Sequence, residues 1–238
     1  MTGNSLSIPP YEIADRSKLT TSMLSAVVAT LFPQAALLAG LSQAAVTFII
    51  DKSARRAQEI LEAESASLDL ASLSDEQQAA FAQMAFRYFE AARQGEYEHT
   101  LEVLAAFIAG EMKKEEPKPG DVGRMARRIE GLSKRDLKII ALMNDLSNRP
   151  PPNPPPYPSK DGISVMDVFN TFSEAKEMGI PGVWESLSEL SSRSLLLMTH
   201  VSGYGTSQDL FLTTEAFRDL IENAEMKFAD HEAKSETP

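Results

Sequence analysis

The chain has 238 residues, of which 43% are hydrophobic, and its 34 acidic and 23 basic side chains give a formal net charge of −11. That length suits one large domain or two small ones, and the hydrophobic content excludes a chain that is disordered throughout. The absence of cysteine excludes disulfides, thiolate metal sites and cysteine catalysis. The acidic balance argues against a protein that binds nucleic acid through its overall charge.

Charge is distributed unevenly along the chain. Residues 51–120 carry a net charge of −6 and residues 160–238 carry −8, whereas residues 121–159 carry +3. Upstream of them, Leu19–Ile50 contains 32 residues without a single charge. The chain therefore has one basic segment, and its charged residues lie just before the proline-rich stretch 150–158.

The uncharged segment predicts an apolar helical hairpin. Pro33 divides it into two expected helices, Thr21–Phe32 and Pro33–Glu64, because proline is tolerated in a first helical turn but not inside a helix. The apolar piece of the second helix, Ala35–Ile50, would span about 24 Å, which is shorter than the roughly 30 Å of a bilayer interior. Residues 1–18 are expected to form a disordered tail.

Three interpretations of Leu19–Ile50 follow. The favoured one is a hairpin buried in the core of a cytoplasmic protein, because the segment is short for a membrane span and contains glutamine, serine and threonine. A hairpin that inserts into a membrane, flanked by Arg55 and Arg56, is the second. A signal peptide is the third and least favoured, since Glu12 and Asp15 precede the apolar run.

Between residues 51 and 147 the pattern is helical, with no strand signal. A capping box at 74–77, with Ser74 at the cap and Gln77 three positions later, predicts the start of one helix, and Gly95 predicts its end. The other expected elements are a helix over 97–110, a charged loop over Lys113–Gly120, a short helix over Val122–Ile129 and a helix capped by Ser133. Residues 19–130 are therefore expected to form a helical bundle that includes the apolar hairpin.

Glu96 and His99 form the Glu-x-x-His spacing that places a carboxylate and an imidazole on one helix face, as in di-iron bundles. Such sites need a second motif and two further glutamates. The other histidines, His200 and His231, have no acidic residue three positions before them. We therefore expect a solvated helix face with no metal and no cofactor.

The basic segment supplies the candidate contacts to nucleic acid or to another anion, namely Arg124, Arg127, Arg128, Arg135 and Lys138. On continuous helices these residues would lie on one side and could contact phosphates. Gly131 is expected to interrupt that continuity, and Glu130 and Asp136 offer partners nearby. Ion pairing within the fold is therefore the favoured interpretation.

After the prolines, strands join the helices. The expected elements are a helix from Ser164 that carries Phe172 and Ala175, a turn at Met178–Pro181, a helix from Val183 to Leu190, a short buried strand at Leu195–Met198, a hairpin tip at Gly203–Gly205, a return strand at Leu210–Leu212 and a last helix capped by Thr213 or Thr214. Helix, turn, helix, β-hairpin, helix is the order of a winged helix.

The string from Trp184 to Phe217 resembles bacterial winged-helix regulators, which commonly read L-x-x-L-x-x-x-G-L-(I/L), then a wing, then L-T-x-x-G. Ser194 and Ala216 stand here where the two glycines are expected. Ser133–Met143 resembles the helix that opens such domains. The resemblance implies a winged-helix-like α+β domain over residues 131–229, with a proline-rich loop at 150–158 and a disordered tail at 230–238, so that the whole chain is mainly α.

Regulators of this kind read DNA with basic or amide side chains on the second helix and with a basic residue in the wing. This chain has Glu185 and Glu189 on that helix, and its wing, His200–Gln208, has no Lys or Arg. Carboxylates there would repel phosphates. The module is therefore expected to contact a protein rather than DNA, through Trp184, Glu185, Glu189 and Tyr204.

The overall arrangement resembles a bacterial abortive-infection alpha family, whose members are associated with phage resistance, above all at Arg55–Leu61 and Leu132–Met143. This resemblance brings no catalytic residues, and no catalytic signature is found. We expect a non-enzymatic, cytoplasmic interaction protein with a protein partner or self-association. The alternative is a winged-helix, DNA-binding transcriptional regulator.

Overall fold

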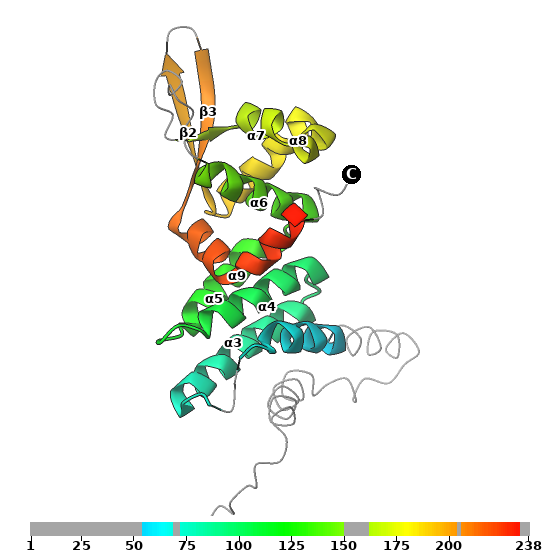
Figure 1. The fold of residues 1–238 in the computed structure, drawn as a ribbon, viewed down its shortest axis with the longest axis vertical. Coiled ribbons are helices and arrows are strands. Elements are labelled where there is room, and N and C mark those ends of the chain that lie inside the picture. The colour runs from blue at the N-terminus through cyan, green and yellow to red at the C-terminus, as the bar shows by residue number, and fades with distance from the viewer. Residues whose placement is uncertain (1–53, 69–71, 150–161, 204–205, 234–238) are drawn as a thin grey trace, which may run out of the picture.

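The computed structural model describes residues 54–68, 72–149, 162–203 and 206–233 (Figure 1). The predicted tail at 1–18, the apolar segment Leu19–Ile50 and the proline-rich stretch 150–158 lie outside the described residues, and so does Tyr204. The described part is mainly helical with a small antiparallel sheet, as the sequence predicts, but the sheet has a third strand beside the expected hairpin. Within these ranges, none of the helices combines the length and the apolar character that spanning a bilayer requires.

The first half of the described chain contains helices only. A helical segment at 54–65 is followed by α3 (Asp75–Arg93), α4 (Glu98–Glu111) and α5 (Pro119–Ile129). The second half contains α6 (Lys134–Asn148), β1 (Ile163–Ser164), α7 (Val165–Thr171), α8 (Ser173–Ser192), β2 (Leu196–Gly203), β3 (Thr206–Thr213) and α9 (Glu215–Ala233). Figure 1 shows α3 and α4 at one end of the molecule, the β2–β3 hairpin at the other, and α6 and α9 between them.

The predicted helix starts are confirmed by their capping geometry. Ser74 accepts the backbone N–H of Gln77, whose side chain accepts the N–H of Ser74 in return. Ser133 caps α6, and Ser164 caps α7, with the same reciprocal arrangement to an aspartate three residues later. Each box satisfies two backbone donors that a helix start leaves open. Because this chemistry is local, the sequence reveals it directly.

The sheet has the order β1-β3-β2, with both pairings antiparallel. Phe211 lies at its centre, opposite Ile163 of β1 and Met198 of β2, and is fully buried. Thr214 is the cap of α9, because its hydroxyl accepts the N–H of Phe217. The last helix runs on to Ala233, beyond its expected end at 229.

The expected turn at Met178–Pro181 is confirmed as a break within α8, where Gly179 adopts a non-helical conformation with a φ of 72° before Pro181. Two other details of the second half differ from the prediction. The helix expected to carry both Phe172 and Ala175 ends at Thr171, and Ala175 belongs to α8. The strand β2 is not buried throughout, since Leu197 and Met198 are 59% and 48% exposed. As an edge strand, β2 has a neighbour on one side only.

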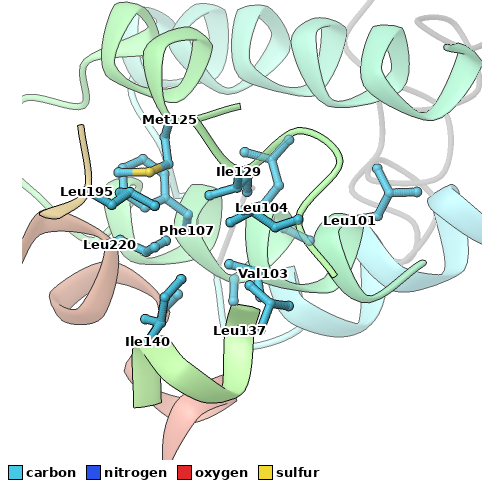
Figure 2. Packing of buried hydrophobic residues seen from close by; sticks show 14 of the residues in the cluster. Leu101, Val103, Leu104, Phe107, Met125, Ile129, Leu137, Ile140, Leu195 and Leu220 are labelled. Carbon is cyan, nitrogen blue, oxygen red and sulfur yellow. The ribbon is translucent and has the colours of Figure 1, made fainter. Parts of the chain in front are cut away.

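The buried apolar side chains form one cluster that extends from Ala57 to Ala224. Figure 2 shows Phe107 of α4 and Met125 of α5 converging with Leu195 and Leu220, which come from the second half of the chain. The core is therefore continuous across the predicted domain boundary at residue 130. This continuity places the end of α5 beside the end of α8, where the candidate site lies.

Candidate functional site

The arginines of α5 occupy its last two turns. Arg124 forms an ion pair with Asp121, one turn earlier on the same helix. Arg127 and Arg128 make no ion pair or hydrogen bond within the described part of the chain. The expected internal pairing thus holds for Arg124 and leaves two guanidinium groups of α5 uncompensated.

The basic residues of α6 belong to different surroundings. Gly131, with a φ of 71°, separates α5 from α6 as the sequence predicts. Arg135 donates to a carboxylate oxygen of Glu185 on α8 at 2.6 Å, and its Nε is buried with no partner among the described residues. Lys138 is exposed on α6. The five predicted basic residues therefore do not form one continuous stripe.

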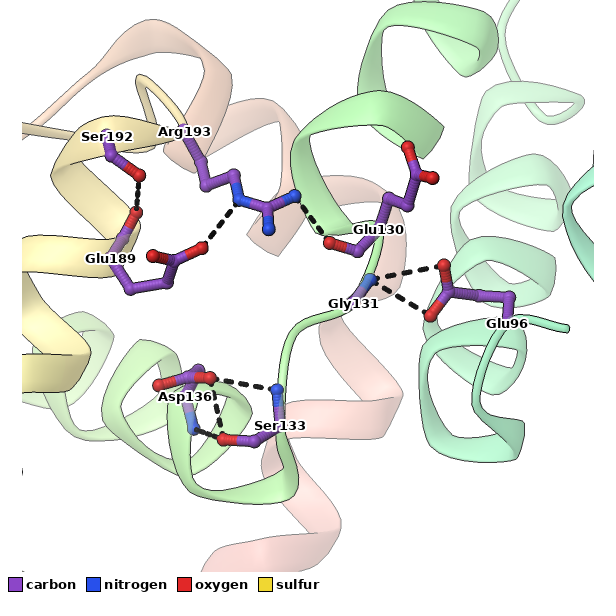
Figure 3. Close-up of polar contacts among 8 residues, drawn as sticks. All are labelled: Glu96, Glu130, Gly131, Ser133, Asp136, Glu189, Ser192 and Arg193. Carbon is purple, nitrogen blue, oxygen red and sulfur yellow. Dashed lines mark hydrogen bonds and ion pairs between the residues drawn. The ribbon is translucent and has the colours of Figure 1, made fainter. Parts of the chain in front are cut away.

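Arg193 joins the two helix ends and was not among the predicted site residues. Its Nε donates to the Glu189 carboxylate at 2.8 Å, and its Nη1 donates to the backbone carbonyl of Glu130 at the end of α5 (Figure 3). Glu130 lies 63 positions earlier in the chain. No local pattern could have placed Arg193 beside α5, because the contact depends on how α8 packs.

The end of α8 has the geometry of a Schellman motif. The N–H of Leu195 donates to the carbonyl of Leu190, and the N–H of Ser194 donates to that of Ser191, both at 3.0 Å. In such a motif the residue after the cap adopts a left-handed conformation, which is usually taken by glycine. Ser194 adopts it here with a φ of 59°. It is one of the two positions where the regulators that this string resembles have glycine.

Replacing Ser194 by glycine is expected to raise the free energy of unfolding by about 0.5–1 kcal/mol. A left-handed conformation costs a residue with a Cβ about 1–2 kcal/mol, of which the entropy of an unfolded glycine offsets roughly 0.5–1 kcal/mol. The hydrogen bonds of the motif use backbone atoms and are retained. Urea unfolding measures the change. The control is Ser192→Gly, two residues earlier at the end of the helix, which should lower the stability. A lower stability of Ser194→Gly would contradict the left-handed conformation of Ser194.

Four arginines line one open hollow of about 350 Å³ at the junction of α5 and α8. Its lining residues are Arg124, Arg127, Arg128, Ser192, Arg193 and Ser194, and no carboxylate is among them. Two neighbouring hollows share some of these arginines but also contain carboxylates. Arg124 and Arg128 line one of them with Asp121, Glu215 and Asp219, and Arg127 lines the other with Glu90, Glu96 and Glu130. The arginines thus form a small basic surface that is bordered by carboxylates.

The exposed face of α8 has an apolar centre and paired charges. Trp184 is 39% exposed, and its ring contacts the buried Phe211 edge-on, with 5.8 Å between the ring centroids. Glu185 is held by Arg135 and Glu189 by Arg193. The neighbouring strand β2 and the rest of α8 add large exposed apolar side chains, namely Ile180, Leu197, Met198 and Val201.

Glu96 and His99 do not share a helix face, so that expectation was wrong. Helix α4 begins at Glu98, and Glu96 precedes it. The Glu96 carboxylate accepts the backbone N–H of Gly131, and Nε2 of His99 lies 2.8 Å from the carbonyl oxygen of Leu132. Both side chains thus bind the α5–α6 connection. No group of three or more potential metal ligands occurs within the described ranges.

The arrangement at the junction of α5, α6 and α8 thus consists of intramolecular ion pairs around two uncompensated arginines and an exposed apolar face. These groups could bind a ligand or a partner through charge and through apolar contact. The sequence predicts only some of the residues that form these surfaces. Comparison with protein-family models, with curated proteins and with solved structures found no match to this chain.

Proposed function

We propose that residues 131–229 form a winged-helix module that contacts a protein partner, in a non-enzymatic cytoplasmic protein. The order of the elements supports the proposal. Helix α6, strand β1, helices α7 and α8, the β2–β3 hairpin and α9 follow one another as in winged-helix domains, and β1 completes the sheet beside β3. The resemblance of the whole chain to the abortive-infection alpha family supports a role in phage defence.

One observation carries the proposed protein contact. On α8, the helix that would read DNA in such a module, both carboxylates are held in ion pairs, and the exposed centre is the ring of Trp184. A helix that presents Glu185 and Glu189 repels phosphates, whereas an exposed tryptophan flanked by ion pairs is typical of protein interfaces. The exposed Met198 and Ile180 extend the apolar contact.

DNA binding by the α5 arginines is the second candidate function, and it is favoured by the uncompensated charges of Arg127 and Arg128. A gel shift with duplex DNA at about 50 mM salt separates the two candidates, since even non-specific binding is strong at low salt. We expect no shift at protein concentrations up to about 10 µM, which is near the range of non-specific dissociation constants. A shift that Arg127→Ala abolishes would favour the regulator.

The partner contact is tested with a pull-down from cells with and without phage infection, using the full chain as bait. We expect a protein that the wild type retains and that Trp184→Ser loses, because truncation of a central aromatic anchor typically costs about 2 kcal/mol or more. Phe86→Ser on α3 is the matched control, since Phe86 and Trp184 are both 39% exposed. Equal retention by the two variants would contradict a contact through α8.

A further inference from the structure

The hollow between α5 and α8 combines arginines of two kinds. Arg193 is fixed by Glu189 and by the backbone of α5, whereas Arg127 and Arg128 have no partner in the described part of the chain. We propose that this hollow binds a compact ligand that carries two phosphate groups. The proposal does not depend on the protein contact through α8, and it concerns a different surface.

The charges in the hollow match such a ligand. Asp121 compensates Arg124, and Glu189 compensates Arg193, so about two positive charges remain on Arg127 and Arg128. Guanidinium groups bind phosphate oxygens through paired, charge-assisted hydrogen bonds, and they keep their charge at every physiological pH. A diphosphate group carries at least this much negative charge, and its two phosphates lie within a few ångströms, so that each guanidinium group can bind one of them.

The two free arginines are not needed to complete the fold locally. Basic side chains at the end of a helix often serve its last carbonyl groups. At the end of α5, Arg193 binds the carbonyl of Glu130, and the N–H of Leu132 donates to the carbonyl of Ile129. Arg127 and Arg128 are therefore available to a ligand.

The two serine hydroxyl groups that line the hollow also differ in whether they have a hydrogen-bond partner. The Ser192 hydroxyl donates to the carbonyl of Glu189 at 2.8 Å, which uses its single proton. The Ser194 hydroxyl makes no hydrogen bond within the described ranges. One hydroxyl donor thus adds to the two guanidinium groups at the same hollow.

The surroundings favour a compact ligand over a nucleic acid. Three carboxylates line the hollow on one side of the basic surface, and three line the hollow on the other side. A duplex that lies across the arginines would extend over these carboxylates, where its phosphates would be repelled. A diphosphate covers a much smaller surface than a duplex, so it meets fewer of these carboxylates. The observations therefore favour a small phosphorylated molecule or a phosphorylated lipid headgroup.

The proposal is tested by isothermal titration of inorganic diphosphate into the full chain at about 50 mM salt. We expect saturable binding, weakened by at least about ten-fold in the double variant Arg127→Ala/Arg128→Ala, because each lost charge-assisted contact contributes roughly a factor of ten or more. The control double variant is Arg93→Ala/Lys176→Ala, which removes the same charge from exposed positions away from the hollow. It should bind within about two-fold of the wild type.

Two further arms identify the source of the phosphate groups. Adenosine diphosphate represents soluble ligands, and vesicles with a bisphosphorylated inositol lipid represent headgroups; binding of either that depends on Arg127 and Arg128 supports the site. Three outcomes overturn the proposal. The first is that the wild type does not bind diphosphate. The second is that both double variants bind diphosphate equally weakly, which would indicate an adventitious ion only. The third is that the wild type binds a 20-bp DNA duplex more tightly than it binds diphosphate.

Discussion

Replacing Gly110 by alanine is expected to lower the free energy of unfolding by about 2–3 kcal/mol. A Cβ atom at this position would lie 2.6 Å from the Cα of Asn223 and closer still to its carbonyl oxygen. These are backbone atoms of α9, so no side-chain rotation can make room, and α4 and α9 must separate. Overpacking of this kind typically costs about 1–3 kcal/mol and occasionally more. We place its cost here at about 3–4 kcal/mol because the obstruction is rigid, and the higher helix propensity of alanine offsets about 1 kcal/mol of that cost.

Gly123→Ala is the matched control for this prediction. Gly123 lies inside α5, and an added Cβ would meet nothing within 4 Å. Alanine favours a helix over glycine by about 1 kcal/mol, so the control should be as stable as the wild type or more stable. Urea unfolding of Gly110→Ala and Gly123→Ala compares the same substitution at a position blocked by another helix and at a position with free space. If the two variants had equal free energies of unfolding, the close crossing of α4 and α9 would be contradicted.

Gly110 also illustrates what the sequence can and cannot predict. A glycine near the end of an apolar stripe indicates the end of a helix, and α4 does end one residue later, at Glu111. Its structural role is different, since it lets α9 pass over α4, and the helix that requires this lies more than 100 residues further along the chain. Capping boxes, in contrast, are completed by neighbours within a few residues, so they could be predicted.

The same distinction applies to the candidate site. The sequence identified the arginines of α5 and the carboxylates of α8 as separate features. It could not predict that Arg135 pairs with Glu185, 50 positions later, or that Arg193 binds the end of α5. These contacts decide which charges are compensated, and only the packing of α8 against α5 and α6 creates them.

Glu111 is the buried acidic residue of α4, with a side chain that is 1% exposed. Its carboxylate accepts a hydrogen bond from Nζ of Lys114 at 2.7 Å and from the backbone N–H of Lys118 at 2.9 Å. It thus ties the connection after α4 back onto the helix. A carboxylate at the C-terminal end of a helix is unfavourable to the helix dipole, so these two contacts must account for its presence.

The ion pair between Lys114 and Glu111 changes the pKa of Lys114. Partial burial lowers the pKa of Lys114, but the hydrogen bond to Glu111 and the charges of Glu111, Glu222 and Asp219 together outweigh it, so the pKa lies above its ordinary value of 10.5. A group whose pKa is raised by folding stabilises the folded state below its unfolded pKa and loses that contribution as the pH rises through its folded pKa. The contribution of Lys114 is therefore present at neutral pH and lost in alkali.

Replacing Glu111 by alanine is expected to lower the free energy of unfolding by about 2–3 kcal/mol at pH 7, because it removes a buried charge-assisted hydrogen bond and the acceptor of the Lys118 N–H. Glu115→Ala, which removes an exposed glutamate of the same connection, should change the stability by less than about 0.5 kcal/mol. Urea unfolding at several pH values measures both. The difference in the free energy of unfolding between the wild type and Glu111→Ala should become smaller as the pH rises above the folded pKa of Lys114. At that pH the wild type loses its Glu111–Lys114 ion pair, which the variant already lacks.

If this difference in free energy stayed constant up to alkaline pH, Glu111 would act through packing rather than through Lys114.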